Sequence, residues 1–276
     1  MGLHTGVNVE MRLKPAPRDS GIVFYRSDKD SYINANVKSI TDTSYATTLS
    51  NGSASVKTVE HILAAAAGLG IDNLLIDVDG PEIPAMDGSA NAFVESIIEA
   101  GVARQASNRP YLKVIKPIVF SEGRTEIALM PYDGMMITYQ IDFDHRILGH
   151  QKMEMEFNAD RFRQSIAPAR TFGFFKDVET LKSMGLALGG SLDNAIVIDD
   201  SGVMNPSGLR FPDEFIRHKV LDFIGDISLS GFPILGHFSV NRSGHTVNAK
   251  FLNHFLQSTD CWEMVTDVER SLKASA

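Results

Sequence analysis

Glu214-Phe215-Ile216-Arg217-His218-Lys219-Val220-Leu221-Asp222-Phe223-Ile224-Gly225-Asp226 is the stretch that most constrains the fold of this chain. Its apolar residues recur at spacings of three and four with no proline between them, which predicts an amphipathic helix. His218, Asp222 and Asp226 are each four residues apart, so they form one polar stripe that drifts about 40° per step around the axis. Such a stripe is usually the solvated side of a helix, and at this point that interpretation and a functional one are equally supported.

A second helical segment, Thr58 to Gly68, carries two adjacent ionisable residues, Glu60 and His61, among small and apolar ones. A histidine and a carboxylate at i, i+4, joined by a histidine from elsewhere, make the ligand set that catalytic zinc uses while a fourth position stays open for water. The sequence therefore predicts a metal site formed by two helices. Glu60, beside one ligand, is then placed to act as a base.

Composition indicates an ordinary globular protein. The chain has 276 residues, of which 43% are hydrophobic and 22% are charged. No apolar run reaches the roughly 18 to 20 residues that cross a bilayer, and the amino terminus lacks a basic segment followed by an apolar one. We therefore expect a cytoplasmic protein without a transmembrane segment.

Charge and cysteine content narrow the functional classes. The formal net charge of -8 argues against nucleic acid as a partner, so an anionic substrate would need a local cationic patch, for which Lys219 and Arg217 are candidates. Cys261 is the only cysteine, which excludes an internal disulfide and a multi-thiolate metal site. Any metal must therefore be held by nitrogen and oxygen atoms.

The chain is expected to divide at Gln105 to Pro110, a short polar stretch that ends in proline, giving domains at 1–107 and 108–276. In the first domain we predict strands at 7–13 and 21–25, short strands within 39–55, the helix from residue 58, a strand at 73–78, and a helix at 89–100 capped by Ser89. The second domain repeats this order, with strands at 112–120, 125–130 and 136–143 and helices at 159–166 and 214–229. This order suggests an internal duplication, although no repeat is visible as sequence identity.

Several blocks of sequence together resemble one known family. They are Thr58-Val59-Glu60-His61, Arg170-Thr171-Phe172-Gly173-Phe174, Leu188-Gly189-Gly190-Ser191, Gly208-Leu209-Arg210-Phe211 with Asp213-Glu214-Phe215, His218-Lys219 with Asp222, and Ser243-Gly244-His245 with Asn248. In order and spacing they resemble the bacterial deacetylases of UDP-3-O-acyl-N-acetylglucosamine, and the similarity runs from Gly2 to about Trp262. The resemblance implies the committed step of lipid A biosynthesis and an α+β fold. This fold has two similar two-layer α/β sandwich domains, each a sheet plus helices, with the helices facing inward and the active site between the domains.

The resemblance also implies a role for each site residue. His61, His218 and Asp222 would hold one catalytic Zn²⁺, with Fe²⁺ as the substitute ion. Glu60 would be the general base, and His245, charged by Asp226, would stabilise the oxyanion or protonate the leaving amine. Thr171 would donate to the substrate carbonyl, and Lys219 would meet substrate oxygens or phosphate.

The residues alone leave these roles open. His245 follows Ser243-Gly244 in a turn, a setting that is also typical of a surface residue, and Asp226 could be an unpaired end of the polar stripe. The other histidines, His4, His145, His150, His237 and His254, have no convergent spacing, so none is assigned to the metal.

Residues 172–198 form an insert that the two-layer plan does not require. It is either a small α/β unit packed on the core or, as the resemblance implies, the frame of a hydrophobic passage for the substrate's acyl chain. The predicted substrate-binding residues are Phe172, Asp177, Met184 and Leu186. The family has a strand-forming segment before the position of Gly2, so we expect the first sheet to lack one edge strand.

The expected partner is a UDP-linked acylated amino sugar, and we expect a monomer that binds no nucleic acid. Two alternatives remain. A metal-dependent deacetylase of another acylated amino sugar would keep the metal ligands and Glu60 without needing the hydrophobic insert. A non-catalytic module that binds a nucleotide sugar would be expected to have lost Glu60, His245 or a ligand, and all of these are present.

Overall fold

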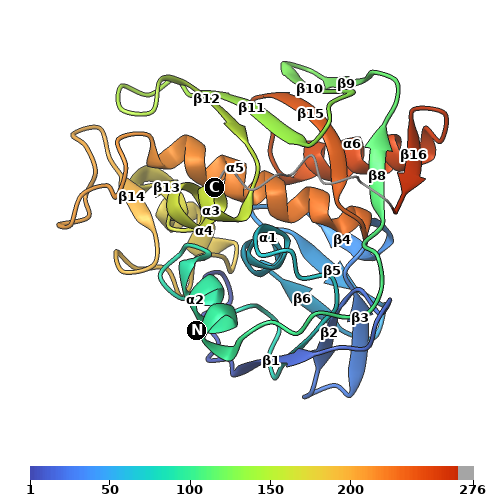
Figure 1. Cartoon of the computed structure of the whole chain (residues 1–276). Coiled ribbons are helices and arrows are strands. Elements are labelled where there is room, and N and C mark those ends of the chain that lie inside the picture. The colour runs from blue at the N-terminus through green and yellow to red at the C-terminus, as the bar shows by residue number, and fades with distance from the viewer. Residues whose placement is uncertain (267–276) are drawn as a thin grey trace.

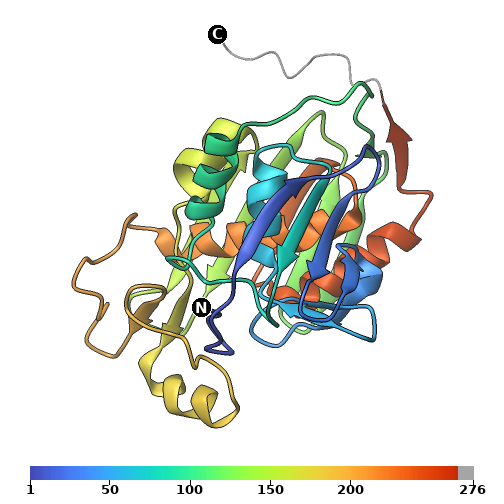
Figure 2. The same ribbon diagram turned by 90° about the horizontal axis from the view of Figure 1, so that it is seen from below.

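Two β-sheets enclose a double layer of helices in the computed structural model of the chain (Figure 1). The structure describes residues 1–266, so the last ten residues of the predicted second domain lie outside the described part. Figure 2, turned by 90°, shows the first sheet lying over the helices. The α+β class and the inward-facing helices are thus as the resemblance implied. The division at residue 107 stays a prediction, and Gly101 to Pro110 contains no helix or strand.

The first sheet belongs to the amino-terminal part of the chain. It has the order β1-β7-β2-β3, in which β2 and β7 are parallel and the other pairs are antiparallel. Two helices, α1 and α2, accompany this sheet, and a small three-stranded sheet, β4-β5-β6, precedes α1 in the chain. The bounds are β1 Met11–Pro15, β2 Ile22–Arg26, β3 Ser31–Asn34, β4 Ile40–Asp42, β5 Thr48–Ser50, β6 Ser55–Lys57, α1 Glu60–Gly68, β7 Leu74–Val78 and α2 Asn91–Ala100.

The second sheet is larger and is covered by the remaining long helices. Its main path is β12-β11-β15-β10-β9, and β8 joins β15 to β16 at one end. Helix α5 contacts β11 and β12, and α6 packs against α5 and β9. The bounds are β8 Tyr111–Val114, β9 Ile118–Glu122, β10 Thr125–Met130, β11 Met135–Asp142, β12 His150–Glu156, α5 Glu214–Ile227, β15 Ile234–Asn241, α6 His245–Gln257 and β16 Trp262–Val265.

A smaller unit projects from the second half. Strand β13 (Phe172–Phe174) pairs in parallel with β14 (Ile196–Ile198), and α4 (Val178–Ser183) lies between them in the chain. Just before it, α3 (Ala159–Arg161) continues into a π-helical turn at Phe162–Ile166. This places a small α/β unit at the insert predicted from residues 172–198.

Helices α1 and α5 meet at the centre of the molecule, where the two halves join. Gly225 makes this approach possible, since a Cβ atom built there would lie 2.1 Å from the carbonyl oxygen of Glu60. The surrounding apolar side chains, such as Ile62 and Phe223, are fully buried. Because any side chain at residue 225 would force the helices apart, this glycine sets the spacing on which the site depends.

Most predicted elements are confirmed, and three boundaries were wrong. The strand predicted at 112–120 is two strands, because Pro117 lies between them and offers no N–H to a ladder. The strand predicted at 7–13 begins only at Met11 and ends at Pro15. Helix α2 begins at Asn91, so Ser89 lies just outside it, although the Ser89 hydroxyl still accepts the N–H of Asn91 at 3.1 Å.

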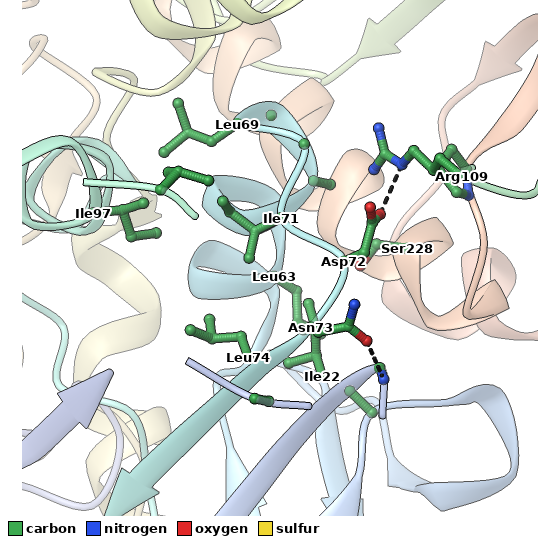
Figure 3. A pocket seen from close by; sticks show the side chains of 18 of the residues that line it. Ile22, Leu63, Leu69, Ile71, Asp72, Asn73, Leu74, Ile97, Arg109 and Ser228 are labelled. Carbon is green, nitrogen blue, oxygen red and sulfur yellow. Dashed lines mark hydrogen bonds and ion pairs between the residues drawn. The ribbon is translucent and has the colours of Figure 1, made fainter. Parts of the chain in front are cut away.

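A groove of about 2710 Å³ lies beside β1, lined also by parts of α1 and α2 and by the 101–110 segment. Figure 3 shows its apolar wall, which includes Leu63, Ile71 and Ile97, and the Arg109–Asp72 ion pair at its rim. No predicted catalytic residue lines it. The groove is therefore distinct from the site described below.

Among residues 1–266, none of the helices has both the length and the apolar character needed to cross a bilayer.

Candidate active site

His61, His218 and Asp222 come together where α1 crosses α5. One ligand atom from each residue lies within 4.8 Å of the other two. The Nε2 atoms of His218 and His61 lie 3.2 and 3.6 Å from Asp222 Oδ1, and the two imidazole rings are nearly perpendicular, at 87°. Two ring nitrogens and one carboxylate oxygen at this spacing fit a divalent metal. The structure thus brings His61 from α1 together with His218 and Asp222, the predicted i, i+4 pair on α5.

Burial and hydrogen bonding prepare these groups to act as ligands. His218 donates its Nδ1 proton to the carbonyl oxygen of Ala169 at 3.0 Å, which leaves Nε2 with a lone pair facing the cluster. Burial lowers the pKa of His61, so that ring is neutral, as a metal ligand must be. Burial alone would raise the pKa of Asp222, but His218 and Lys219 outweigh it and hold the pKa well below its usual value.

Glu60 lies beside this cluster at the start of α1. Its Oε2 accepts the backbone N–H of Thr47 at 3.0 Å, and its Oε1 lies 3.9 Å from His245 Nε2. Burial raises the pKa of Glu60 to about 7. A carboxyl group with a pKa near neutrality is suited to accept a proton and release it again.

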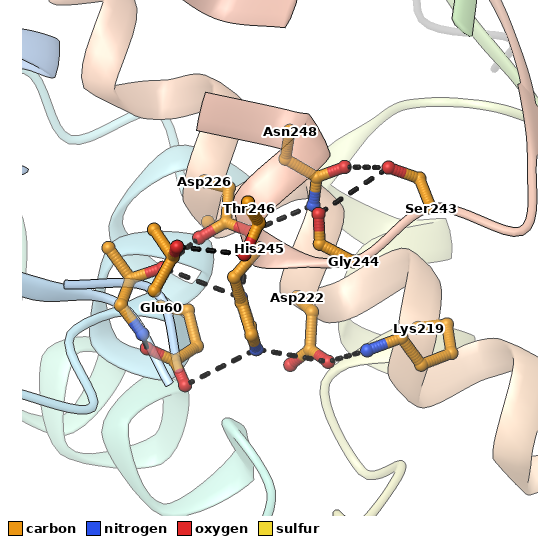
Figure 4. A network of polar contacts seen from close by, with 12 residues as sticks. Glu60, Lys219, Asp222, Asp226, Ser243, Gly244, His245, Thr246 and Asn248 are labelled. Atoms are coloured by element: carbon orange, nitrogen blue, oxygen red, sulfur yellow. Dashed lines mark hydrogen bonds and ion pairs between the residues drawn. The ribbon is translucent and has the colours of Figure 1, made fainter. Parts of the chain in front are cut away.

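The His245 ring lies between Glu60 and Asp222 and is held by Asp226 (Figure 4). Its Nδ1 donates to Asp226 Oδ2 at 2.8 Å, while Nε2 lies 4.0 Å from Asp222 Oδ2. Burial would lower the pKa of His245, but the Asp226 carboxylate outweighs it and raises the pKa to about 9. The imidazole is therefore a cation at neutral pH. His245 is the first residue of α6, so the interpretation of an exposed turn was wrong, and Asp226 is not an unpaired end of the stripe.

Two further residues complete the Asp226 network. The hydroxyl of Thr47 donates to Asp226 Oδ1 at 2.6 Å, and the amide of Asn248 donates to Oδ2 at 2.8 Å. Asn248 is oriented in turn by Ser243, whose hydroxyl donates to its Oδ1 at 2.5 Å. Sequence reasoning placed Asn248 in a motif but gave it no role, and it missed Thr47 completely. Thr47 lies 13 residues before Glu60 in the chain, and no local pattern marks it.

Lys219 also reaches the cluster. Its Nζ lies 2.7 Å from Asp222 Oδ2, the carboxylate oxygen that faces away from the two ligand histidines. Burial would lower the pKa of Lys219, but the Asp222 carboxylate outweighs it and raises the pKa above its usual value. The site thus contains a fixed positive charge in a protein whose net charge is negative.

Thr171 and Phe172 lie at the point where the chain enters the insert. The backbone N–H of Thr171 donates to the Gly88 carbonyl at 2.8 Å. The ring of Phe172 meets the rings of Phe215 and His218 edge to face, with centroids 5.1 and 6.3 Å apart. Phe172 is therefore next to a predicted metal ligand.

The other predicted substrate-binding residues lie further along the insert. Asp177 and Met184 are exposed and Leu186 is half-buried. Met184 exposes 59% of its surface, Phe175 55% and Leu188 52%. The insert thus presents an open apolar surface at Phe175, Met184 and Leu188, while its strand β14 is buried in the core through Ile196 and Ile198.

Within residues 1–266, the His61, His218 and Asp222 cluster is the one group of histidine, cysteine and acidic side chains with the spacing of a metal site. His4 lies in the predicted turn, where its backbone N–H donates to Glu82. His237 contacts the Thr138 hydroxyl on the second sheet. Neither belongs to the cluster.

Comparison with known proteins identifies the family. A family model described as UDP-3-O-acyl N-acetylglycosamine deacetylase matches residues 1–257. The chain belongs to this family. A relative from Thermodesulfovibrio yellowstonii, named UDP-3-O-acyl-N-acetylglucosamine deacetylase, is 45% identical over 276 residues, which cover 100% of this chain and 94% of the relative. Relatives of the same name from Acidithiobacillus ferrooxidans and Oleidesulfovibrio alaskensis are 46% and 50% identical. The matches cover 98% and 91% of this chain and 90% and 83% of those relatives.

Proposed function

We propose that this chain hydrolyses the N-acetyl group of UDP-3-O-(3-hydroxyacyl)-N-acetylglucosamine, giving UDP-3-O-(3-hydroxyacyl)-glucosamine and acetate, the committed step of lipid A biosynthesis. The observation that carries this proposal is the convergence of Glu60, His245 and the three candidate ligands at one buried point. Family membership supports the identity of the substrate.

We assign His61, His218 and Asp222 as ligands of one Zn²⁺, with Fe²⁺ as the substitute ion. When bound, such an ion lowers the pKa of water to about 7 and polarises a carbonyl group. The nitrogen and oxygen donors, the Ala169 carbonyl behind His218 and the absence of a cysteine from the cluster support this assignment. Because the ligands come from α1 and α5, ion binding would also tie the two halves of the molecule together.

Glu60 and His245 divide the proton transfers between them. Glu60 takes a proton from the attacking water, for which its pKa of about 7 is suited. His245 enters as a cation because Asp226 holds its Nδ1 proton, so Nε2 stabilises the oxyanion and then protonates the departing amine. Glu60 Oε1 and His245 Nε2 lie 3.9 Å apart, so both can reach the same bound amide group.

Thr171 and Lys219 supply the remaining polar contacts. The hydroxyl of Thr171 donates to the substrate carbonyl, a contribution whose removal typically costs about 3 kcal/mol. Lys219, charged and held by Asp222, meets substrate oxygens or phosphate as a point charge. Phe172 packs against the sugar, and the exposed apolar residues of the insert, including Met184 and Leu186, contact the acyl chain. We place Asp177 at the nucleotide portion.

We further propose that the protein works as a monomer in the cytoplasm. All candidate ligands and proton donors come from one chain, which supports the monomer. A single cysteine, Cys261, fits a reducing compartment.

The decisive experiment measures acetate release from UDP-3-O-(3-hydroxymyristoyl)-N-acetylglucosamine by the purified chain. Activity should disappear after treatment with a chelator and return with a stoichiometric amount of Zn²⁺. The matched control substrate is UDP-N-acetylglucosamine, which lacks the acyl chain and should react far more slowly. Equal rates on both substrates would favour a deacetylase of another amino sugar. Tight binding of the acylated substrate without acetate release would favour a non-catalytic module.

A further inference from the structure

The segment 167–171 links the two halves of the molecule beside the site. On one side, Ala90 N–H donates to the Ala167 carbonyl at 2.9 Å, and Thr171 N–H donates to the Gly88 carbonyl at 2.8 Å. On the other side, the Ala169 carbonyl accepts the Nδ1 proton of His218 on α5 at 3.0 Å. The orientation of the candidate metal ligand His218 and the position of the candidate oxyanion donor Thr171 therefore both depend on segment 167–171.

A buried carboxylate anchors this segment to α5. Glu214, the first residue of α5, is fully buried. Its oxygens accept the backbone N–H of Arg170 at 3.0 Å, Arg170 Nε at 2.9 Å and Nη2 at 3.1 Å, and the backbone N–H of Arg210 at 2.6 Å. Burial would raise the pKa of Glu214, but Arg170 outweighs it and keeps the pKa below its usual value. The carboxylate is thus ionised and its acceptor positions are filled.

Further contacts place the partners of Glu214. Arg170 Nη2 donates to the Gly208 carbonyl at 2.8 Å. Arg210 donates to the Pro168 carbonyl at 2.8 Å and pairs with Asp87 at 2.8 Å. Because Asp87 belongs to the first half of the chain, these contacts extend from α5 to the turn that holds Thr171.

We propose that Glu214 is a positioning residue for the deacetylation reaction. Arg170 stands between Ala169 and Thr171, so the bond between Glu214 and the Arg170 backbone fixes the residues on both sides of it. The Glu214 carboxylate thereby fixes the position of the Ala169 carbonyl, which orients His218, and of the backbone that carries the Thr171 hydroxyl. This inference rests on the proposed function, and Glu214 lies one turn of helix before the candidate ligand His218.

Replacing Glu214 by glutamine should loosen both connections at once. The NH₂ group of the glutamine would face an N–H donor that a Glu214 oxygen now accepts, so that hydrogen bond would be lost. The Arg170 guanidinium would also stay buried without a full counter-charge. Loss of a partner behind a metal ligand typically costs about 10–100-fold in metal affinity or activity. We expect kcat to fall by a factor in this range, while KM changes by less than about threefold, because an oxyanion donor acts mainly in the transition state.

The test compares Glu214→Gln with Asp213→Asn in the full-length chain. Asp213 is the adjacent residue and forms a more exposed ion pair with Arg217, so this control also removes one carboxylate charge beside α5. The measurements are Zn²⁺ affinity by competition with a chromogenic chelator, kcat and KM for acetate release, and the imidazole N–H resonances of ¹⁵N-histidine-labelled protein. In Glu214→Gln the affinity and kcat should fall and the hydrogen-bonded resonance of His218 should shift. In Asp213→Asn the Zn²⁺ affinity, kcat and KM should stay within about twofold of the wild type, and the His218 resonance should not shift.

A purely structural role would give a different result. Glu214→Gln would then melt at a lower temperature, but the folded variant would have the Zn²⁺ affinity and kcat of the wild type. This outcome would overturn the proposal. If Glu214→Gln does not fold, Arg170→Lys provides the test. It keeps the charge and both backbone bonds but loses the guanidinium fork, so smaller losses in the same quantities are expected, and wild-type values would overturn the proposal.

Failure of the proposed function would look different again. The wild-type chain would then release no acetate, whereas the Zn²⁺ affinity and the His218 resonance would still report whether Glu214 positions the ligand.

Discussion

The α1–α5 junction and the insert at 172–198 are built in opposite ways. At the junction the ionisable side chains of Glu60, His218 and Asp226 are buried, and each has a hydrogen-bond partner that fixes its orientation. In the insert, Met184 and Leu188 each expose more than half of their surface. Chemistry needs groups held in place at low dielectric, whereas an apolar surface that adapts suffices to receive a hydrocarbon chain. Substitutions at the junction should therefore alter turnover and metal binding, and those in the insert should alter only recognition.

The largest effect is expected from His218→Ala. This change removes a ligand nitrogen and leaves two protein ligands, so Zn²⁺ should no longer be retained through dialysis, and activity should fall below detection. Metal content by atomic emission and acetate release measure the two outcomes. Retention of one Zn²⁺ per chain with normal activity would remove His218 from the ligand set.

Glu60→Gln should separate catalysis from metal binding within the same junction. Glutamine keeps the volume of the side chain and can accept the Thr47 N–H, but it cannot take a proton. We expect a normal Zn²⁺ content and a kcat lower by about 10²–10⁴-fold. Loss of the metal from this variant would instead indicate that Glu60 is itself a ligand.

Asp226→Asn should change the pH dependence of the reaction. Asp226 is the main group that raises the pKa of His245 to about 9, so the cation persists below that pH in the wild type. Removal of the charge lowers this pKa, and the alkaline limb of the kcat/KM profile should move down by about 1–3 pH units. An unmoved limb would mean that another group controls it. Asp213→Asn, which touches neither residue, serves as the control.

Gly225→Ala tests the close approach of the two helices. The new methyl group would lie 2.1 Å from the Glu60 carbonyl oxygen, so α1 and α5 must separate, at a cost of about 1–3 kcal/mol in the free energy of unfolding. Gly173→Ala in the insert is the matched control, because nothing lies within 4 Å of a Cβ atom there. Chemical denaturation should show a large difference between the two variants, and equal stabilities would refute the packing argument.

Local spacing in the sequence predicted the parts of the site that lie on one helix. His218 and Asp222 are four residues apart and do meet, at 3.2 Å. The pairing of His245 with Asp226 came from family resemblance, since nothing near His245 in the chain indicates its partner. Thr47 is 179 residues from Asp226, so only the tertiary fold brings them together.

The fold shows the same division between local and distant information. Many helices and strands with clear periodicity were predicted, but β15 and the helix α6 (His245–Gln257) were missed. The error at 112–120 came from giving the apolar run more weight than Pro117. The order of the second sheet could not be predicted, because it depends on β15 (Ile234–Asn241) entering between β11 and β10, more than ninety residues from either. Glu214 and Arg170 looked like ordinary charged residues in the sequence, and their burial as a pair appears only in the structure.

The smallest effect is expected in the insert, from Met184→Ser. This exposed side chain should contribute only through apolar contact with the acyl chain, so the change should raise KM for the 3-hydroxymyristoyl substrate by about 3–10-fold. The KM for a short-chain analogue, kcat, Zn²⁺ content and melting temperature should all be unchanged. Equal increases in KM for long and short acyl chains would place Met184 at the sugar or nucleotide instead. A fall in Zn²⁺ content would contradict the separation of the insert from the α1–α5 junction. It would mean that the exposed insert also helps to position the buried metal ligands.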